Sequence, residues 1–516
     1  MKGDRRWWWA VFVLGLVVGT TWALSVPPSG GPDEPAHIVK AVGVARGDLS
    51  TDVDWHPGWI GPAPKTSIDV PNRYAHSIMI EQTSCWMGVE HQPSSCAPPL
   101  ADDAGAMMTT STYVGAYQPA YYALTGLPTR FLPPAKGVFA ARLVSVAIGA
   151  ALAASAWASA RRLGPSTIAG TVLALTPAVV YLSSTVNPQG PEILAAIAVW
   201  VTGLLVLSEP NVERRILIRL GVAATVLVSA RPTGVVLAVL IVGALVVTAA
   251  DRASLRSLWQ RRSVRWMVGA MALAFAANAL HVVATDALNS VMKTGDPPSS
   301  SEAVDLMVDA LPRLLSEQVG LLSWSGFVTL NLPPILVRAW LAAVAALVAA
   351  AVALGSVRQK LMATVLVVAW AAMPVVGGAM SPEVGWQGRY GLPVGVGIPI
   401  VAGWAIDRWA ERAVSVRPGL PRRKLAAGAL FAATALSGLC LLAGQAKVMS
   451  RNLHGQPSST FASRDARWNG PLTPNLLFAG ALAGSVVLTG SGAIAFAREL
   501  RRTDGAGAEE AVSAAG

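Results

Sequence analysis

An acidic pair followed by a histidine stands directly after the first hydrophobic stretch, in the segment Pro32-Asp33-Glu34-Pro35-Ala36-His37. Carboxylates at a membrane surface can accept a proton from an attacking hydroxyl or contribute to a cation site. The preceding stretch, 7–26, is about 20 residues long, enough at 1.5 Å per residue to cross roughly 30 Å of hydrocarbon. Asp33 and Glu34 are therefore expected at the membrane exit. The simpler alternative is that they cap the helix that follows, where aspartate is favoured.

The composition describes an all-α polytopic membrane protein. Of 516 residues, 53% are hydrophobic and 13% are charged, and apolar runs recur along the whole chain. The first span lacks a good cleavage site at Ser25-Val26-Pro27-Pro28, which favours a retained helix over a cleaved signal peptide. Hydropathy predicts about 12 transmembrane helices (11–13), with cores at 7–26, 138–160, 166–183, 190–207, 216–230, 234–250, 266–284, 335–355, 361–379, 389–406, 425–443 and 473–497.

Positive charge predicts cytoplasmic N- and C-termini, because lysine and arginine accumulate in short inner loops. This orientation requires the proline-interrupted segment 117–134 to lie at the interface, since a full span there would place the basic stretches 252–265 and 408–424 outside. The long segments 27–136, 285–334 and 444–472 are then extracytoplasmic. The net charge of +11 reflects this topology and contact with membrane lipids, and it indicates no nucleic-acid partner.

Most polar residues are therefore predicted to lie outside the membrane. The sequence contains no glycine-rich phosphate-binding loop motif that would indicate nucleotide chemistry on the cytoplasmic side. Short surface helices are expected at 34–46 and 305–315, whereas 55–64, rich in tryptophan, proline and glycine, is expected to be irregular. The tail 498–516 has the composition of a disordered cytoplasmic segment.

Two of the three cysteines, Cys85 and Cys96, share the first outer segment, where a disulfide can form and persist. His91 lies between them, but one histidine and two cysteines do not complete a zinc site. A disulfide that closes a loop is the favoured interpretation.

The order of motifs resembles the GT-C superfamily of integral-membrane glycosyltransferases, most closely an actinobacterial branch of membrane proteins of unknown function. The resemblance covers roughly residues 7–406. The motifs that carry it are the Asp33-Glu34 segment, Tyr117-Gln118-Pro119-Ala120-Tyr121-Tyr122, Ala141-Arg142-Leu143, Asn187-Pro188, Arg231-Pro232 and Gln387-Gly388-Arg389-Tyr390 with Pro393. One departure from the pattern is Gln189, where relatives tend to carry an acidic residue.

The resemblance implies transfer of a sugar from a polyprenyl-phosphate donor to an envelope glycan or lipid acceptor on the outer face. Asp33 would act as general base in an inverting reaction, and Glu34 would orient Asp33 or bind a cation. A divalent cation, Mg²⁺ or Mn²⁺, is left open, with Asp33, Glu34 and His37 as candidate ligands. The expected organisation is a catalytic core over 1–406, including the outer segment 27–136, then C-terminal helices over 407–497 with the outer loop 444–472, and the tail.

The arginines Arg142, Arg231 and Arg389 lie near the outer ends of predicted spans, against the positive-inside trend. Guanidinium groups match phosphate oxygens, so these three are candidates to bind the donor phosphate. The alternatives are contact with lipid headgroups and pairing with Glu192 or Glu383.

Aromatic and polar residues near the same span ends are candidates for substrate contact. An interfacial aromatic belt is the alternative for the tyrosines and tryptophans, because the chain has 18 tryptophans. His37 is equally well explained as an ordinary hydrogen-bonded histidine. The candidates are His37, Gln118, Tyr121, Tyr122, Asn187, Tyr390, Trp324 and Trp386.

Two other functions remain open at this point. A transporter or flippase of lipid-linked saccharides would need a polar path through the spans, which contain few ionisable residues. A non-catalytic envelope scaffold would keep the fold without the activity.

Overall fold

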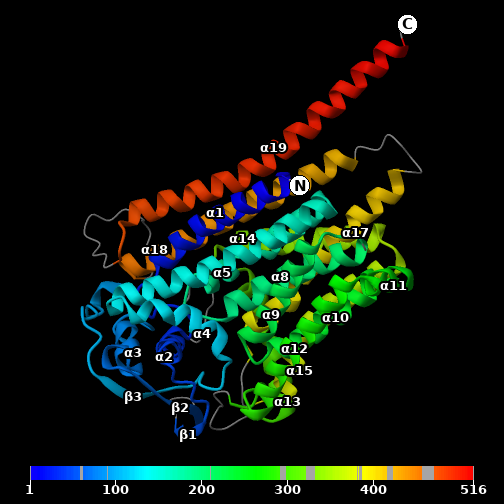
Figure 1. Ribbon diagram of the computed structural model, residues 1–516. Coiled ribbons are helices and arrows are strands. Elements are labelled where there is room, and N and C mark those ends of the chain that lie inside the picture. The colour runs from blue at the N-terminus through cyan, green and yellow to red at the C-terminus, as the bar shows by residue number, and fades with distance from the viewer. Residues whose placement is uncertain are drawn as a thin grey trace.

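The computed structural model is a helical bundle with a small mixed domain at one end (Figure 1). The structure describes residues 2–57, 62–89, 91–209, 211–290, 298–320, 332–380, 382, 386–414, 422–455 and 470–514. The bundle helices are α1 (Lys2–Ser25), α5 (Pro134–Leu163), α6 (Pro165–Ala174), α7 (Pro177–Ser183), α8 (Gln189–Ser208), α9 (Arg214–Ala230), α10 (Gly234–Ala249), α12 (Arg262–Ala284), α14 (Pro334–Leu354), α15 (Val357–Met380), α16 (Leu392–Gly395), α17 (Gly397–Val414), α18 (Arg422–His454) and α19 (Pro474–Ala514).

The helical membrane fold is confirmed, with a slightly smaller count of spans. Among the described residues, nine helices are long and apolar enough to cross a membrane, or up to 11 if each of two bent pairs forms one span. One bent pair is α6 with α7; the other is α10 with α11 (Arg252–Gln260). The predicted core at 216–230 falls on α9, which has only 17 residues, and this accounts for the difference from about 12.

Close packing of α1 on α5 anchors the start of the chain. Gly15 and Gly19 of α1 form a small-xxx-small pair that lets the two backbones approach. A Cβ added at Gly19 would lie 2.6 Å from Val146 Cγ1, and one at Gly15 would lie 3.0 Å from the Cβ of Ala150. This contact fixes the end of α1, and therefore the position at which the outer segment leaves the membrane bundle.

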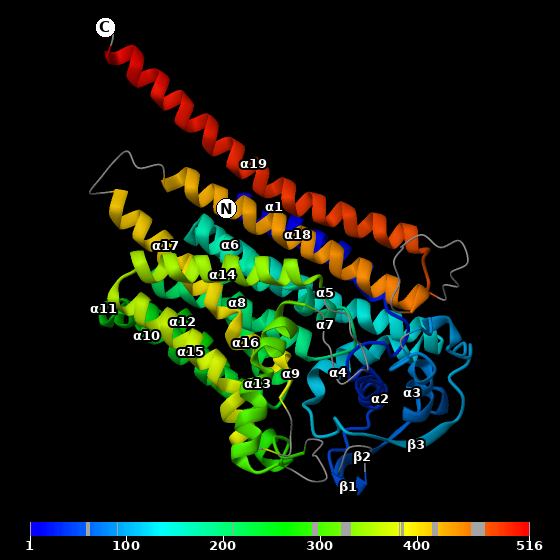
Figure 2. The ribbon, with the colours of Figure 1, turned by 180° about the vertical axis from the view of Figure 1, so that it is seen from behind.

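The outer segment 27–136 folds against that end of the bundle, as both ribbon views show (Figures 1 and 2). Its elements are α2 (Glu34–Ala45), β1 (Asp54–Pro57), β2 (Pro62–Pro71), η1 (Asn72–Tyr74), α3 (His76–Ser84), η2 (Ser94–Cys96), β3 (Met107–Thr112), α4 (Pro119–Gly126) and η3 (Leu127–Arg130). Helix α4 has only eight residues, about 12 Å, too short to span a membrane, which agrees with the interfacial interpretation of 117–134.

The prediction of an irregular segment at 55–64 was wrong at both of its ends, where strands β1 and β2 are described; residues 58–61 lie outside the described residues. The strands form an antiparallel sheet in the order β1-β2-β3, with Trp55 opposite Pro64 and Ile68 opposite Thr110. Ile68 and Val70 are buried while the alternate residues face solvent, a period-two pattern that indicates a strand. The preceding segment 55–64, with two tryptophans, three prolines and two glycines, obscured this signal.

Helix α2 was predicted as an amphipathic surface helix, but it is buried on nearly every side. It packs against β2 and α4 in a core that includes Val39, Val42, Val70 and Tyr122. The predicted surface helix at 305–315 is the longer α13 (Ser300–Val319), which ends beside the short helix η4 (Gly388–Gly391).

The C-terminal helices α18 and α19 pack together and onto α1 (Figure 1). Residues 498–514, expected to be disordered, are described as the continuation of α19, which projects beyond the other helices.

Candidate functional site

Asp33 stands in the turn between α1 and α2 with a left-handed backbone, φ 57°. It occupies the N-cap position of α2, yet its carboxylate makes no capping hydrogen bond to that helix. Instead, Oδ1 accepts a hydrogen bond from the Tyr113 hydroxyl at 3.1 Å, and Oδ2 accepts one from Nη2 of Arg389 at 2.5 Å. The side chain remains 36% exposed. Simple capping therefore does not account for this carboxylate.

The surroundings keep Asp33 ionised. Burial alone would raise the pKa of the carboxyl group, but the charge of Arg389 and the hydrogen bonds from Arg389 and Tyr113 outweigh it. The pKa of Asp33 is therefore lower than its ordinary value. Asp33 is therefore a partly accessible, ionised carboxylate that can accept a further hydrogen bond or a proton.

Arg389 reaches Asp33 from η4, 356 positions away in the sequence. Its Nε donates to Gln387 Oε1 at 2.7 Å, whereas Nη1 is buried and has no partner among the described residues. The Arg389 side chain is only 4% exposed, and burial of an unpaired guanidinium nitrogen reduces the stability of the folded protein. A negatively charged ligand would accept the missing hydrogen bond.

Two buried side chains fix the backbone around Arg389. The carboxylate of Glu317, at the end of α13, accepts a hydrogen bond from the Gly388 amide at 2.9 Å. Gln189, at the start of α8, donates from Nε2 to the carbonyl of Arg389 at 3.3 Å. These contacts explain how a loop between spans can hold a guanidinium in a defined position.

His37 lies one helical turn beyond Asp33 and is buried. Its Nδ1 is 2.8 Å from the Tyr122 hydroxyl, and the two rings stack with centroids 5.9 Å apart. Burial lowers the pKa of His37 to about 3, and the neighbouring arginines act in the same direction against the opposing effect of Asp33. His37 is therefore neutral near pH 7, and as neutral imidazole it exchanges a hydrogen bond with Tyr122.

Glu34 does not contact Asp33 and is fully buried against Arg142 of α5. Its carboxylate accepts from Arg142 Nε at 2.7 Å and from Nη2 at 2.5 Å, and also from the amides of Gly31 and Val186. The remaining donors of Arg142 go to the carbonyls that end α1, at residues 23, 26 and 27. With both side chains at 0% exposure, the pair closes the base of the outer segment and leaves Arg142 no donor for a phosphate. This geometry contradicts the phosphate role predicted for Arg142 and the orienting role predicted for Glu34.

Arg231 follows α9 and pairs with a carboxylate of α8. Its Nη1 lies 3.3 Å from Glu192 Oε2, and the other oxygen of Glu192 accepts from the Thr233 hydroxyl at 2.9 Å. The guanidinium also lies over the rings of Tyr117 and Tyr390, at 6.0 and 5.5 Å from their centroids. Pairing with Glu192 is thus the alternative that the structure contains. Arg389 also lies over the Tyr390 ring, 5.6 Å from its centroid, so both arginines contact this tyrosine.

The remaining candidates fall into two groups. Asn187 donates to the Pro32 carbonyl at 2.8 Å and so supports the backbone beside Asp33, whereas the Tyr121 hydroxyl bonds the Ser145 hydroxyl at 3.1 Å. Gln118 is 2% exposed, and neither atom of its amide has a partner among the described residues. Trp386 packs edge-on against Tyr390 with centroids 5.7 Å apart.

The remaining predictions are substrate contact by Trp324, pairing with Glu383 and a possible cation site. Trp324 lies outside the described residues, as does Glu383. Within the described ranges, no group of three or more histidine, cysteine or acidic residues is arranged to hold a metal ion. Asp33 is held by Arg389 and Tyr113, and Glu34 by Arg142, so the predicted trio with His37 does not fit a cation.

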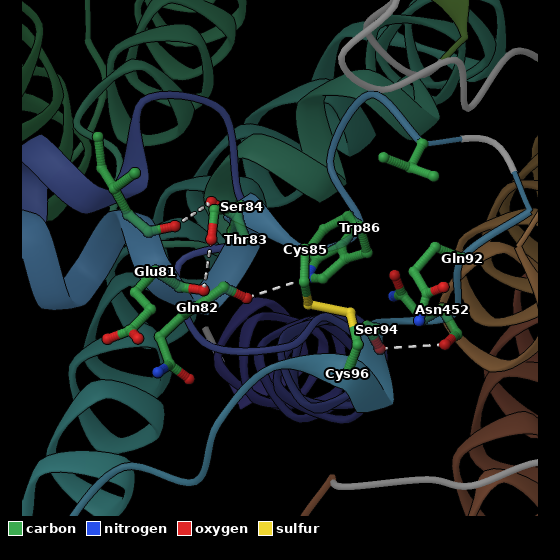
Figure 3. The surroundings of a disulfide bond; sticks show 12 residues. Glu81, Gln82, Thr83, Ser84, Cys85, Trp86, Gln92, Ser94, Cys96 and Asn452 are labelled. Atoms are coloured by element: carbon green, nitrogen blue, oxygen red, sulfur yellow. Dashed lines mark hydrogen bonds between the residues drawn. A yellow bond between two sulfur atoms is a disulfide. The ribbon is translucent and has the colours of Figure 1, made fainter.

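Cys85 and Cys96 form a disulfide, with 1.96 Å between the sulfur atoms, as their shared outer segment predicts (Figure 3). The bridged loop lies against the end of α18, where the Ser94 hydroxyl donates to the carbonyl of Asn452 at 3.0 Å. Arg451 donates to the carbonyls of Gln92 and other loop residues. The disulfide closes this loop, and the hydrogen bonds to Asn452 and Arg451 tie the loop to α18.

Comparison with known protein families identifies the family of this chain. Residues 16–398, well over half of the chain, match the family described as "Predicted membrane protein (DUF2142)". The chain belongs to this family. The matched range includes Asp33, Tyr113 and Arg389 of this DUF2142 protein.

Comparison with solved structures finds similarity at low sequence identity. The chain is similar to the crystal structure of ArnT from Cupriavidus metallidurans bound to undecaprenyl phosphate, at 16% identity and a TM-score of 0.44, over 96% of this chain and 78% of that one. The apo structure of the same protein gives 16% and 0.44, over 95% and 77%. No curated protein matches.

Three residues of this DUF2142 protein were not anticipated from the sequence. Tyr113 and Glu317 lie in the segments 27–136 and 285–334, without a recognisable motif around them. Gln189 was noted only as a departure from an acidic residue, although its amide supports Arg389. Only the polar residue at the start of a span, Gln189, carried a signal that could have been used.

Proposed function

We propose that this protein is a GT-C-type glycosyltransferase that moves a sugar from a polyprenyl-phosphate donor to an acceptor hydroxyl at the outer membrane surface. One observation carries the proposal. A carboxylate that is ionised, accessible and not engaged in capping lies beside a guanidinium with a buried, unpaired nitrogen. That is the pair of groups needed to accept a proton and to stabilise a departing phosphate.

In the proposed reaction, the acceptor oxygen attacks the anomeric carbon while Asp33 takes its proton. The bond from that carbon to the phosphate oxygen breaks, and the phosphate leaves with the electron pair, which inverts the anomeric centre. Arg389 balances the charge on the phosphate through Nη1. Arg231, which contacts the same Tyr390 ring as Arg389, adds positive charge even while paired with Glu192.

An extracytoplasmic site explains the choice of donor class. Nucleotide sugars are confined to the cytoplasm, so a site that faces outward needs a donor that reaches it through the bilayer. A lipid-linked sugar meets this need. Envelope glycans or lipids are the acceptors found on that side.

Residues that hold the site rather than react complete the proposal. Tyr113 directs the Asp33 carboxylate, and Glu317 and Gln189 hold the Arg389 loop. No step passes through a metal ion, because Asp33, Glu34 and His37 do not converge on a common point.

The test compares cells that lack the protein with cells that carry it or a variant, by mass spectrometry of polyprenyl-linked sugars and of envelope glycans. Loss of the protein should cause one polyprenyl-phosphate sugar to accumulate and one glycan feature to disappear. Asp33→Asn should behave like the deletion, since general base catalysis contributes about 10²–10⁴-fold.

The matched control is Asp103→Asn, which removes an exposed carboxylate from the same outer segment, 77% accessible and far from Asp33 in the sequence. It should restore the glycan fully. Full restoration by Asp33→Asn at normal protein levels would remove Asp33 from the mechanism.

A further inference from the structure

A groove separate from the Asp33 site runs between α9 and α12 on the outside of the bundle. Its volume is about 690 Å³, within the range of about 300–1,000 Å³ typical of ligand pockets. Its walls are largely apolar and include Ile218 and Val222 of α9 and Trp266 of α12, which are 55%, 55% and 68% exposed. In a membrane these side chains face lipid.

One end of this groove is cationic. Arg214 and Arg262, the first residues of α9 and α12, both line it. Neither makes a hydrogen bond or ion pair with any part of the chain that the structure describes. The adjacent Glu213 is engaged by Arg162 and Arg215, so it does not neutralise them.

The groove occupies the half of the bundle remote from Asp33. From Arg214 to Val226 the wall of α9 is about 18 Å long at 1.5 Å per residue, roughly half of a 30 Å hydrocarbon layer or slightly more. The other ends of both helices lie toward the candidate site. Arg231 directly follows the last residue of α9, and His281 near the end of α12 bonds the carbonyl of Ala116 at 3.0 Å.

We propose that this groove binds an anionic glycerophospholipid, with an acyl chain along the apolar wall and the headgroup phosphate between Arg214 and Arg262. Guanidinium groups bind phosphate oxygens in pairs, and cationic residues at a membrane surface attract anionic lipids. A polyprenyl-phosphate donor is a different occupant, because its phosphate would have to reach Arg389 at the opposite end of these helices.

Native mass spectrometry of the full chain, released from nanodiscs, tests the proposal with phosphatidylglycerol, phosphatidylcholine and undecaprenyl phosphate as separate probes. The wild-type protein should retain phosphatidylglycerol. The double variant Arg214→Gln/Arg262→Gln should lose about 30-fold in affinity for it, from two arginines at the surface.

The charge-matched control is Arg252→Gln/Arg256→Gln, on the exposed helix α11 next to the groove but not in its wall. It should retain phosphatidylglycerol like the wild type. An equal loss in this control would reduce the effect to general surface charge and overturn the proposal.

A third variant fills the groove and leaves the charges of Arg214 and Arg262 unchanged. A Cβ added at Gly221 meets only Met267 Cγ, at 3.6 Å, so Gly221→Leu extends into the groove without a clash in the core. It should also release phosphatidylglycerol, with unfolding temperature as the check on folding. Retention of phosphatidylcholine as strong as that of phosphatidylglycerol, or displacement of the latter by undecaprenyl phosphate, contradicts the proposal.

Discussion

Replacement of Arg142 by methionine tests whether this arginine holds the fold or the donor. Arg142 donates five hydrogen bonds, two to Glu34 and three to the carbonyls that end α1. Methionine fills similar space and provides none of them. Glu34, at 0% exposure, would then keep only the amides of Gly31 and Val186.

The expected loss follows from the burial of the pair. Removal of one partner of a buried ion pair costs about 3–5 kcal/mol, because the other charge stays buried and uncompensated. That is a large share of the about 5–15 kcal/mol by which folded domains are stable. The double variant Glu34→Gln/Arg142→Met removes the uncompensated charge, so it should be more stable than Arg142→Met alone.

The assay is the free energy of unfolding in detergent, measured together with the binding of undecaprenyl phosphate to the folded fraction. Arg408→Met is the control, because its pair with Glu411 is exposed and is worth no more than about 1 kcal/mol. Arg389→Met should show the opposite pattern, with weaker binding and a smaller loss of stability. If Arg142→Met folds as stably as the wild type but no longer binds the lipid phosphate, the structural assignment of Arg142 is refuted.

Two further predictions concern acidity and the disulfide. The pKa of Asp33 lies below its ordinary value and that of His37 lies at about 3, so the carboxylate stays charged and the imidazole neutral as the pH falls from 8 to 5. Transfer activity followed by product mass should therefore show no acid limb in that range, and a limb near pH 6.5 that His37→Gln abolishes would contradict the neutral state of His37. Cys85→Ser/Cys96→Ser should lower stability by about 2–4 kcal/mol and speed amide exchange in residues 86–96, while transfer persists, because the bridged loop contacts α18 and not Asp33. Unchanged exchange in that loop would show that its contacts with Asn452 and Arg451 suffice to hold it.

Hydropathy was sufficient to predict the helical bundle, because each span is a local pattern of apolar residues. The sheet was missed because the alternation in β2 is only a few residues long and lies beside a segment dominated by proline and tryptophan. The prediction that α2 lies exposed at the surface was also wrong. Nothing in the sequence of α2 shows that β2 and α4 cover its outer face.

The position of Asp33 after the first span made it a candidate from sequence, and the predicted outer location of Arg389, unusual for an arginine, did the same for Arg389. Their contact was not predictable, since it depends on how α13, α8 and the η4 loop meet in space. Arg142 illustrates the limit most clearly. Its outer position suggested phosphate, but only coordinates reveal that Glu34 and three carbonyls already use all its donors.

The long separation between Asp33 and Arg389 also bears on how the protein is made. A ribosome adds about 5–20 residues per second, so about 20–70 seconds pass between the two residues. Throughout that interval Asp33 is part of the growing chain without the guanidinium that pairs with it. A chain that stops before residue 389 therefore never assembles the pair, even if all of its preceding helices have formed.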